Sequence, residues 1–93
     1  MPRDKRDVIS NLKKKGFVDS KQTHHDYLTY KTNEGKISSV YTYTSHSGKE
    51  IADSILSQMA KQCKLTRTQF LKLIDCTMNQ QEYELELKNQ SLL

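Results

Sequence analysis

Hydrophobic residues in this chain follow two periodicities, one helical and one alternating. Near the start, Val8, Ile9 and Leu12 form a single apolar stripe, which predicts a short amphipathic helix. Asp4 stands where an N-cap or a first-turn acid is favoured, and Gly16 stands where a left-handed residue ends helices. We therefore expect this helix to begin near Asp4 and to end before Gly16.

Three segments after this helix favour β-strands. They are 17–20, 27–31 and 36–44, which are rich in aromatic and β-branched residues. The segment 32–35 is typical of a hairpin loop, because Gly35 accommodates a positive φ. Since the connections are short, an antiparallel meander is the simplest sheet.

The third strand segment divides its side chains between two faces. Ile37, Ser39, Tyr41 and Tyr43 share one face, and the simplest interpretation of the two tyrosines is packing within the sheet. The other face carries smaller side chains: Ser38, Val40, Thr42 and Thr44.

A second helical pattern begins at Lys49. Ile51, Ile55, Met59 and Cys63 recur every four residues and predict a helix whose apolar stripe covers the sheet. Cys63 lies on this stripe, which favours a small core residue over a reactive thiol. Further apolar residues widen the stripe: Ala52, Leu56 and Ala60.

Two capping signatures predict short helices near the end of the chain. The segments 66–69 and 79–82 both have the spacing of a capping box. The last helix has a thin apolar face made of Tyr83 and Leu87, with Leu85 off that line. Three outcomes fit this face, namely docking on the body, packing on a second copy, or fraying.

The predicted order is helix, three strands, helix and two short C-terminal helices. Helices segregated to one side of a small antiparallel sheet indicate an α+β protein. With 93 residues there is room for one core. We expect residues 1–76 to form a single domain and residues 77–93 to form a C-terminal helical extension.

The charge is basic and unevenly distributed. The net charge is +4 and the isoelectric point is about 9.1. Residues 1–37 contribute +4, residues 38–76 contribute +2 and residues 77–93 contribute −2. A basic body favours an anionic partner, although ordinary solvated faces explain the charge equally well.

The cysteines and the apolar runs bear on the cellular setting. Cys63 and Cys76 are too few and too far apart for a disulfide framework or a zinc site. The three histidines lack the spacing of a closed metal site, so we expect no metal and no cofactor. Because no apolar run suits a signal peptide or a membrane helix, we expect a reduced cytoplasmic protein without membrane contact.

The stretch 21–30 concentrates the candidate chemistry. It holds His24 and His25, which in a strand point to opposite faces, so at most one lines a given site. A histidine pair in a polar loop is often surface decoration, but imidazole also titrates near working pH and suits acid–base catalysis. Tyr27 and Tyr30 also face opposite ways, so one belongs to the core and the other is free to stack on bases.

The basic residues near this stretch suit contact with a phosphate backbone. Lys13, Lys14 and Lys15 also load the last turn of the first helix, where positive charge serves the helix dipole alone. Both interpretations stay open. Lys21 is a further candidate for phosphate contact, and His46 suits the start of a helix as well as it suits catalysis.

Several runs, taken in order, resemble the HicA-type toxin family. They cover roughly residues 5–75 with similar spacing, and the order of the runs carries more weight than any one of them. The runs are 11–17, 23–25, His46, 48–51, 55–56, 59–62 and 64–70.

This resemblance implies a fold like the double-stranded RNA-binding domain and a toxin that cleaves messenger RNA. It also implies a HicB-like antitoxin partner that masks the site. The family's essential histidine corresponds to His24 in this chain, with His25 as the fallback if the register shifts by one. We expect His24 to act as general acid or base without a metal.

Two other classes of function remain open. The same basic face would suit a non-catalytic module that binds double-stranded RNA by shape. The capped C-terminal helices would instead suit an interaction domain that recruits a partner protein. The sequence leaves the oligomeric state undetermined.

Overall fold

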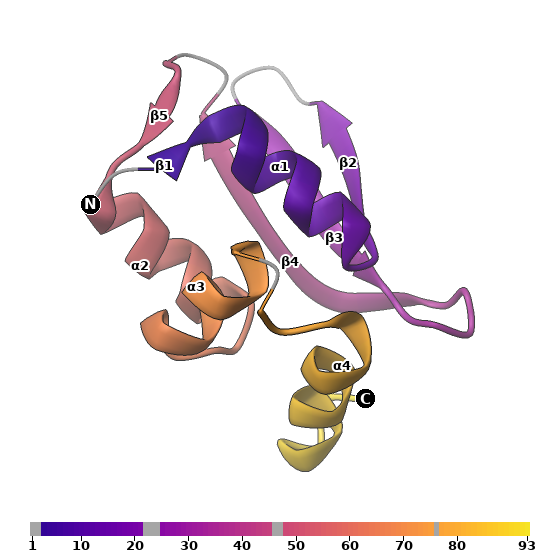
Figure 1. Ribbon diagram of the computed structural model, residues 1–93. Helices are drawn as coiled ribbons and strands as arrows, with labels where there is room; N and C mark the ends of the chain where they lie inside the picture. The colour runs from indigo at the N-terminus through magenta and orange to yellow at the C-terminus, as the bar shows by residue number, and fades with distance from the viewer. Residues whose placement is uncertain (1–2, 22–24, 46–47, 76) are drawn as a thin grey trace.

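The computed structural model describes residues 3–21, 25–45, 48–75 and 77–93. This part of the chain forms a three-stranded antiparallel sheet, a two-stranded ladder and four helices (Figure 1). The α+β class and the meander expected from the sequence are confirmed. In chain order, the elements are β1 (Arg3–Asp4), α1 (Lys5–Lys14), β2 (Phe17–Lys21), β3 (His25–Lys31), β4 (Ile37–Ser45), β5 (Glu50–Ile51), α2 (Asp53–Gln62), α3 (Arg67–Ile74) and α4 (Gln80–Asn89).

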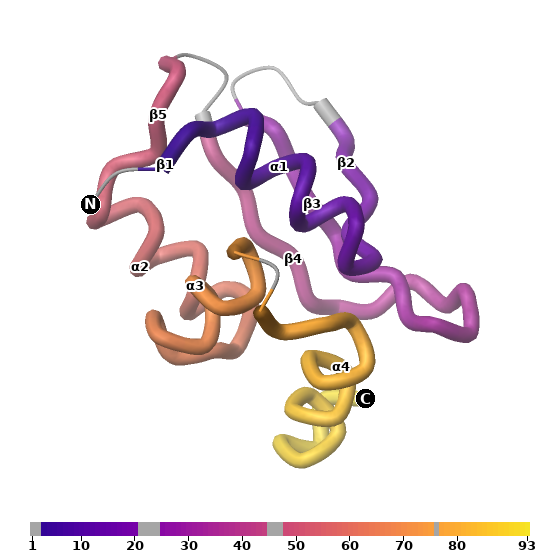
Figure 2. Tube along the Cα trace, in the orientation of Figure 1, coloured from indigo at the N-terminus to yellow at the C-terminus, as the bar shows by residue number. Residues whose placement is uncertain are grey.

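β3 is the central strand and pairs with β2 on one side and with β4 on the other. Phe17 lies opposite Tyr30 in the first ladder, and Tyr27 lies opposite Tyr43 in the second. Buried and half-buried residues alternate along β3, so the sheet has one covered face and one open face. In Figures 1 and 2, α1 lies across β2 and β3, while α2 runs beside β4.

The core fills the space between the covered face and the helices. Among its polar side chains, Thr42 is fully buried and donates from Oγ1 to Gln62 Oε1 at 2.6 Å. The same amide oxygen accepts the backbone N–H of Tyr43 at 3.3 Å, so Gln62 satisfies both groups. The largest fully buried side chains are Tyr30, Tyr83, Phe70, Leu12, Leu28, Leu56, Met59, Leu73 and Leu87.

The first helix follows its sequence signals closely. The Asp4 side chain accepts the backbone N–H of Asp7 at 3.2 Å, which confirms the predicted N-cap. Val8 and Leu12 are buried, and Gly16 has a φ of +100° just after the helix. Only glycine takes that conformation readily, so the predicted end of the helix is confirmed as well.

Asn11 of α1 and Lys15, which directly follows this helix, cap the end of α3. Asn11 Nδ2 donates to the carbonyl of Ile74 at 2.7 Å, and Lys15 Nζ donates to the carbonyl of Leu73 at 2.9 Å. These carbonyls belong to the last turn, where a helix leaves acceptors without partners in its own backbone. A positive charge there also matches the negative end of the helix dipole.

The helix expected from Lys49 begins later, at Asp53, so that part of the prediction was wrong. Glu50 and Ile51 instead form β5, which pairs antiparallel with β1. The backbone N–H of Lys5 donates to the carbonyl of Lys49 at 2.8 Å and extends this contact. The short ladder therefore joins the beginning of the chain to the segment that precedes α2.

The apolar stripe of α2 is also centred differently from the prediction. Ile51 is buried, at 2% exposed, but it lies in strand β5 and not in a helix. The spacing of apolar residues predicted that Ile51 is buried, but it did not determine the backbone conformation. Ile55 is 38% exposed and so leaves the stripe. The helix buries Leu56 and Met59, and Cys63 follows in the core as expected.

Both predicted capping boxes are present. The Thr66 hydroxyl accepts the Gln69 N–H at 3.1 Å, and Gln69 Oε1 accepts the Thr66 N–H at 3.0 Å. Asn79 and Glu82 exchange the corresponding bonds at 2.8 and 3.0 Å. Each box satisfies two helix N-terminal donors, which fixes the starts of α3 and α4.

Of the three outcomes considered for the last helix, docking on the body is observed. Tyr83 and Leu87 are fully buried, and the Tyr83 hydroxyl donates to the Cys63 carbonyl at 2.9 Å. The rings of Phe17 and Tyr83 stack with centroids 5.7 Å apart. Leu85, off the apolar line, is 59% exposed. Helix α4 thus contributes to the same core as α1 and the sheet.

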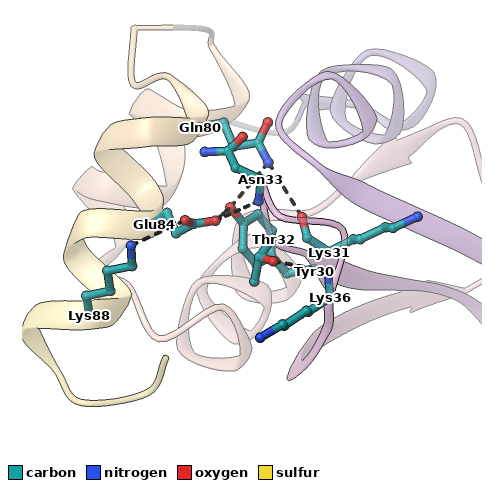
Figure 3. Close-up of polar contacts among 8 residues, drawn as sticks. All are labelled: Tyr30, Lys31, Thr32, Asn33, Lys36, Gln80, Glu84 and Lys88. Carbon is teal, nitrogen blue, oxygen red and sulfur yellow. Dashed lines mark hydrogen bonds and ion pairs between the residues drawn. The ribbon is translucent and has the colours of Figure 1, made fainter.

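A polar contact also joins α4 to the sheet (Figure 3). Glu84 Oε1 accepts the Tyr30 hydroxyl at 2.7 Å and the backbone N–H of Asn33 at 3.0 Å. Lys88 Nζ lies 3.6 Å from the other carboxylate oxygen. The Asn33 N–H and the Tyr30 hydroxyl lower the pKa of Glu84, because both stabilise the charged form against the opposing effect of burial.

Candidate nucleic-acid interface

The open face of the sheet carries most of the aromatic residues that lie outside the core. Among the described residues, His25 and Tyr27 come from β3, and Tyr41 and Tyr43 come from β4. Tyr41 is 49% exposed, and the other three are half-buried. We call these four residues the ring cluster.

The rings of the cluster are close enough to form one continuous surface. The Tyr27 ring centroid lies 5.4 Å from that of Tyr43 and 6.2 Å from that of Tyr41. The His25 ring meets Tyr43 edge-on at 5.0 Å and Tyr27 at 6.0 Å. Strand pairing explains this grouping, because Tyr27 and Tyr43 are directly opposite each other and side chains two residues apart share a face.

The orientation of the β4 side chains, with the larger ones on the open face, is the feature of this face that most indicates a binding surface. Thr42 and Thr44 are buried, whereas Tyr41 and Ile37 are exposed, Ile37 at 64%. Burying a large apolar side chain is worth roughly 1.5–3 kcal/mol, so the reverse orientation would place the more hydrophobic face in the core. Exposed apolar residues gathered on one face mark a binding surface more often than isolated ones do.

Only one of the two adjacent histidines falls within the described part of the chain. His24 lies outside it, as does His46. His25, the fallback, points to the open face and belongs to the ring cluster. The next residue, Asp26, is buried on the covered face, where its Oδ2 lies 3.3 Å from Lys5 Nζ. That carboxylate therefore faces away from the imidazole.

The predicted RNA-binding residues are divided between the two sides of the sheet. Tyr27 is on the open face, whereas Lys13 and Lys14 are exposed on α1, which packs against the covered face. Lys13 Nζ lies 3.7 Å from Asp19 Oδ1. Lys15 is buried and caps α3 through the Leu73 carbonyl, a role that neither of the two interpretations of the lysines had included. Lys21 is in β2, and only its backbone is described.

No family model matches this chain. The searches of curated proteins and of solved structures likewise give no match. Among the described helices, none has both the length and the apolar character needed to cross a membrane.

The expected division of Tyr27 and Tyr30 between core and surface is observed, whereas Tyr41 and Tyr43, which were expected to pack within the sheet, lie on its open face. Tyr30 is fully buried and Tyr27 is on the open face. The available signal was the repeated spacing of two, in His25 with Tyr27 and again in Tyr41 with Tyr43, which puts four rings on one face of a hairpin. The residues that alternate with the tyrosines of β4 are Thr42 and Thr44, and their polarity predicted that the tyrosine face would be the buried one.

Cys63 offers no reactive thiol. It is fully buried, and burial raises the pKa of its thiol to about 12. Because the thiolate is the nucleophilic form, this cysteine is a core residue, as predicted. Within the described segments, no group of three His, Cys, Asp or Glu residues is arranged to hold a metal ion.

Proposed function

We propose that this protein binds single-stranded RNA on the ring cluster and cleaves it there, with a histidine at the start of β3 as general acid or base. The observation that carries the proposal is the outward orientation of Tyr27, Tyr41 and Tyr43 around His25. Exposed aromatic faces of this kind stack on unpaired bases, and each stacked base contributes about 1–3 kcal/mol.

Single-stranded RNA fits this surface better than a duplex does. In double-stranded RNA the base faces are already stacked on each other, and proteins read the duplex by its shape and its 2′-hydroxyl groups. The ring cluster offers flat apolar area instead, with Val18 at 46% exposed on the neighbouring strand. This favours the stacking mode over the alternative of a non-catalytic duplex-binding module.

The cleavage part of the proposal depends on imidazole chemistry. The reaction requires a base to remove the proton of the 2′-hydroxyl and an acid to protonate the leaving oxygen. His25 presents its ring on the same surface as the stacking tyrosines, which keeps it near the backbone of a bound strand. The resemblance to the HicA-type toxins assigns this role first to His24, so both histidines belong to the test.

The same resemblance supports two further parts of the proposal. The order α1-β2-β3-β4-α2 with both helices on one face is compatible with a fold like the double-stranded RNA-binding domain. A HicB-like antitoxin is the proposed protein partner, and it would mask the ring cluster. Competition between the purified partner and RNA for this face tests that part.

The first experiment measures binding to a single-stranded RNA whose 2′-hydroxyls are methylated, so that cleavage through the 2′-hydroxyl cannot occur. We expect Tyr41→Ala to weaken binding about tenfold through the lost stacking. Tyr41→Phe keeps the ring and serves as the matched control. Unchanged affinity in Tyr41→Ala and Tyr27→Ala, or affinity insensitive to salt, contradicts the binding proposal.

The second experiment measures cleavage of the unmodified RNA. We expect His24→Ala or His25→Ala to abolish cleavage while leaving binding of the methylated RNA within about threefold, since the three tyrosines supply most of the proposed stacking area. Cleavage that persists in the double variant excludes histidine catalysis. If the purified wild type binds RNA but never cleaves it, the catalytic part of the proposal fails and the binding part stands.

A further inference from the structure

The ring cluster ends in a hollow of about 400 Å³ between β4 and the beginning of α2. Tyr43 and His25 form the side of the hollow that adjoins the cluster, and Ile55 provides an apolar wall from α2. Its volume lies within the range of about 300–1,000 Å³ that is typical of ligand pockets. The hollow is therefore large enough for a small flat group and opens beside the surface proposed to bind RNA.

Gln58 and Glu50 are two of the polar side chains that line the hollow. Gln58 lies on its α2 side, and its Nε2 is 3.5 Å from the Tyr43 hydroxyl. Glu50 also lines the hollow, from β5, and is exposed. The amide offers one donor and one acceptor side by side, whereas the carboxylate offers acceptors alone.

We propose that this hollow receives one unstacked adenine of the bound RNA. The inference rests on the proposed RNA-binding function. The adenine plane would lie against the apolar walls, including Ile55, and its edge would meet Gln58 and Glu50. A glutamine amide pairs in a bidentate manner with N6 and N7 of adenine, and the second N6 hydrogen remains for the carboxylate.

The other bases match these side chains less well. Uracil and guanine present carbonyl oxygens where adenine presents its N6 amino group, so the Glu50 carboxylate would face another acceptor. Cytosine has an amino group, but its single ring covers less of the apolar wall formed by Ile55 and the Tyr43 ring. Preference for adenine over uracil is accordingly the largest difference expected.

The test compares two uridine oligomers with methylated 2′-hydroxyls, one of which carries a single central adenosine. Fluorescence anisotropy gives both dissociation constants for each variant. We expect the wild type to favour the adenosine oligomer by at least about fivefold, the lower end for a bidentate contact. Gln58→Ala should remove this preference and leave the affinity for the all-uridine oligomer unchanged. Gln81→Ala, an exposed glutamine of α4, is the matched control.

The outcomes separate this inference from the proposed function. If the wild type binds both oligomers equally, or if Gln58→Ala keeps the preference, the base-reading hollow is excluded and RNA binding stands. If neither oligomer binds, both proposals fail together. Thermal unfolding checks that Gln58→Ala is folded, and Glu50→Gln provides an independent variant, expected to reduce the preference for adenosine without weakening binding of the all-uridine oligomer.

Discussion

The hydroxyl of Tyr30 donates a 2.7 Å hydrogen bond to Glu84 Oε1, which joins the central strand of the sheet to the last helix. Both side chains are buried, Tyr30 fully and Glu84 to 7% exposed. Burial raises the pKa of Tyr30, so its hydroxyl stays a donor at any ordinary pH. The bond also positions the strand whose other face carries the ring cluster.

Glu84→Ala is expected to destabilise the protein by about 1.5–3 kcal/mol, because it leaves the Tyr30 hydroxyl and the Asn33 N–H without their acceptor. Urea unfolding measures this change. Glu34→Ala, an exposed carboxylate in the hairpin loop, is the control and should stay within about 0.5 kcal/mol of the wild type. If the two variants are equally stable, the carboxylate does not hold α4 in place.

Stability should depend on pH through the same carboxylate. The pKa of Glu84 is lower in the folded protein than in the unfolded chain, where it is about 4.3. The stabilisation is therefore complete above the unfolded value and is lost as the pH falls through the folded value. Urea unfolding from neutral to strongly acidic pH should show a smaller decline in Glu84→Gln than in the wild type. Parallel curves for the two proteins would rule out this linkage.

Lys14 and Lys15 are adjacent and have the same charge, but their expected roles differ. Lys15→Met removes a buried donor from the Leu73 carbonyl and should cost about 1–3 kcal/mol. Lys14→Met changes an exposed residue and should have an effect within about 0.5 kcal/mol. Thermal or urea unfolding of both variants gives the comparison. Equal losses would mean that net charge, rather than the cap on α3, explains the effect.

Alanine substitutions at Gly16 and Gly35 distinguish the cost of a strained backbone from the cost of steric crowding. Both have a positive φ, so Gly35→Ala should cost roughly 1 kcal/mol from the backbone alone. At Gly16 an added Cβ would lie 2.9 Å from the Lys31 carbonyl oxygen and 2.5 Å from Gln80 Nε2, whereas at Gly35 the nearest atom is 3.9 Å away. We expect Gly16→Ala to lower the free energy of unfolding, measured with urea, by clearly more than Gly35→Ala does. Equal losses would show that Gln80 and the Lys31 carbonyl move aside at little cost.

Local signals in the sequence were sufficient to predict the ends of helices, where a single side chain or glycine determines the backbone conformation. Asp4, Gly16 and the two capping boxes fix helix ends through bonds within a few residues, and all were predicted correctly. The β1–β5 ladder was not predicted. It pairs residues that are far apart in the sequence, such as Arg3 and Ile51, and strands of two residues are too short to show an alternating pattern.

The candidate site could be predicted only in part. A strand must divide Tyr27 and Tyr30 between its faces, and this division is observed, but strand geometry alone did not say which of the two is buried. Which face of β4 is buried could not be decided from polarity, since Thr42 is accepted in the core only because Gln62, twenty residues later, bonds its hydroxyl. That contact is a property of the assembled fold.

The position of Tyr83 has a consequence for how the protein is made. During translation, Phe17 and Tyr30 are synthesised well before Tyr83. The centroid of the Tyr83 ring lies 5.7 Å from that of Phe17 and 5.0 Å from that of Tyr30. Until α4 is synthesised, these aromatic rings lack the cover of Tyr83 and present apolar surface of the kind that chaperones and proteases recognise. Prematurely terminated copies should therefore be removed by cellular quality control, so that only chains extending through α4 accumulate.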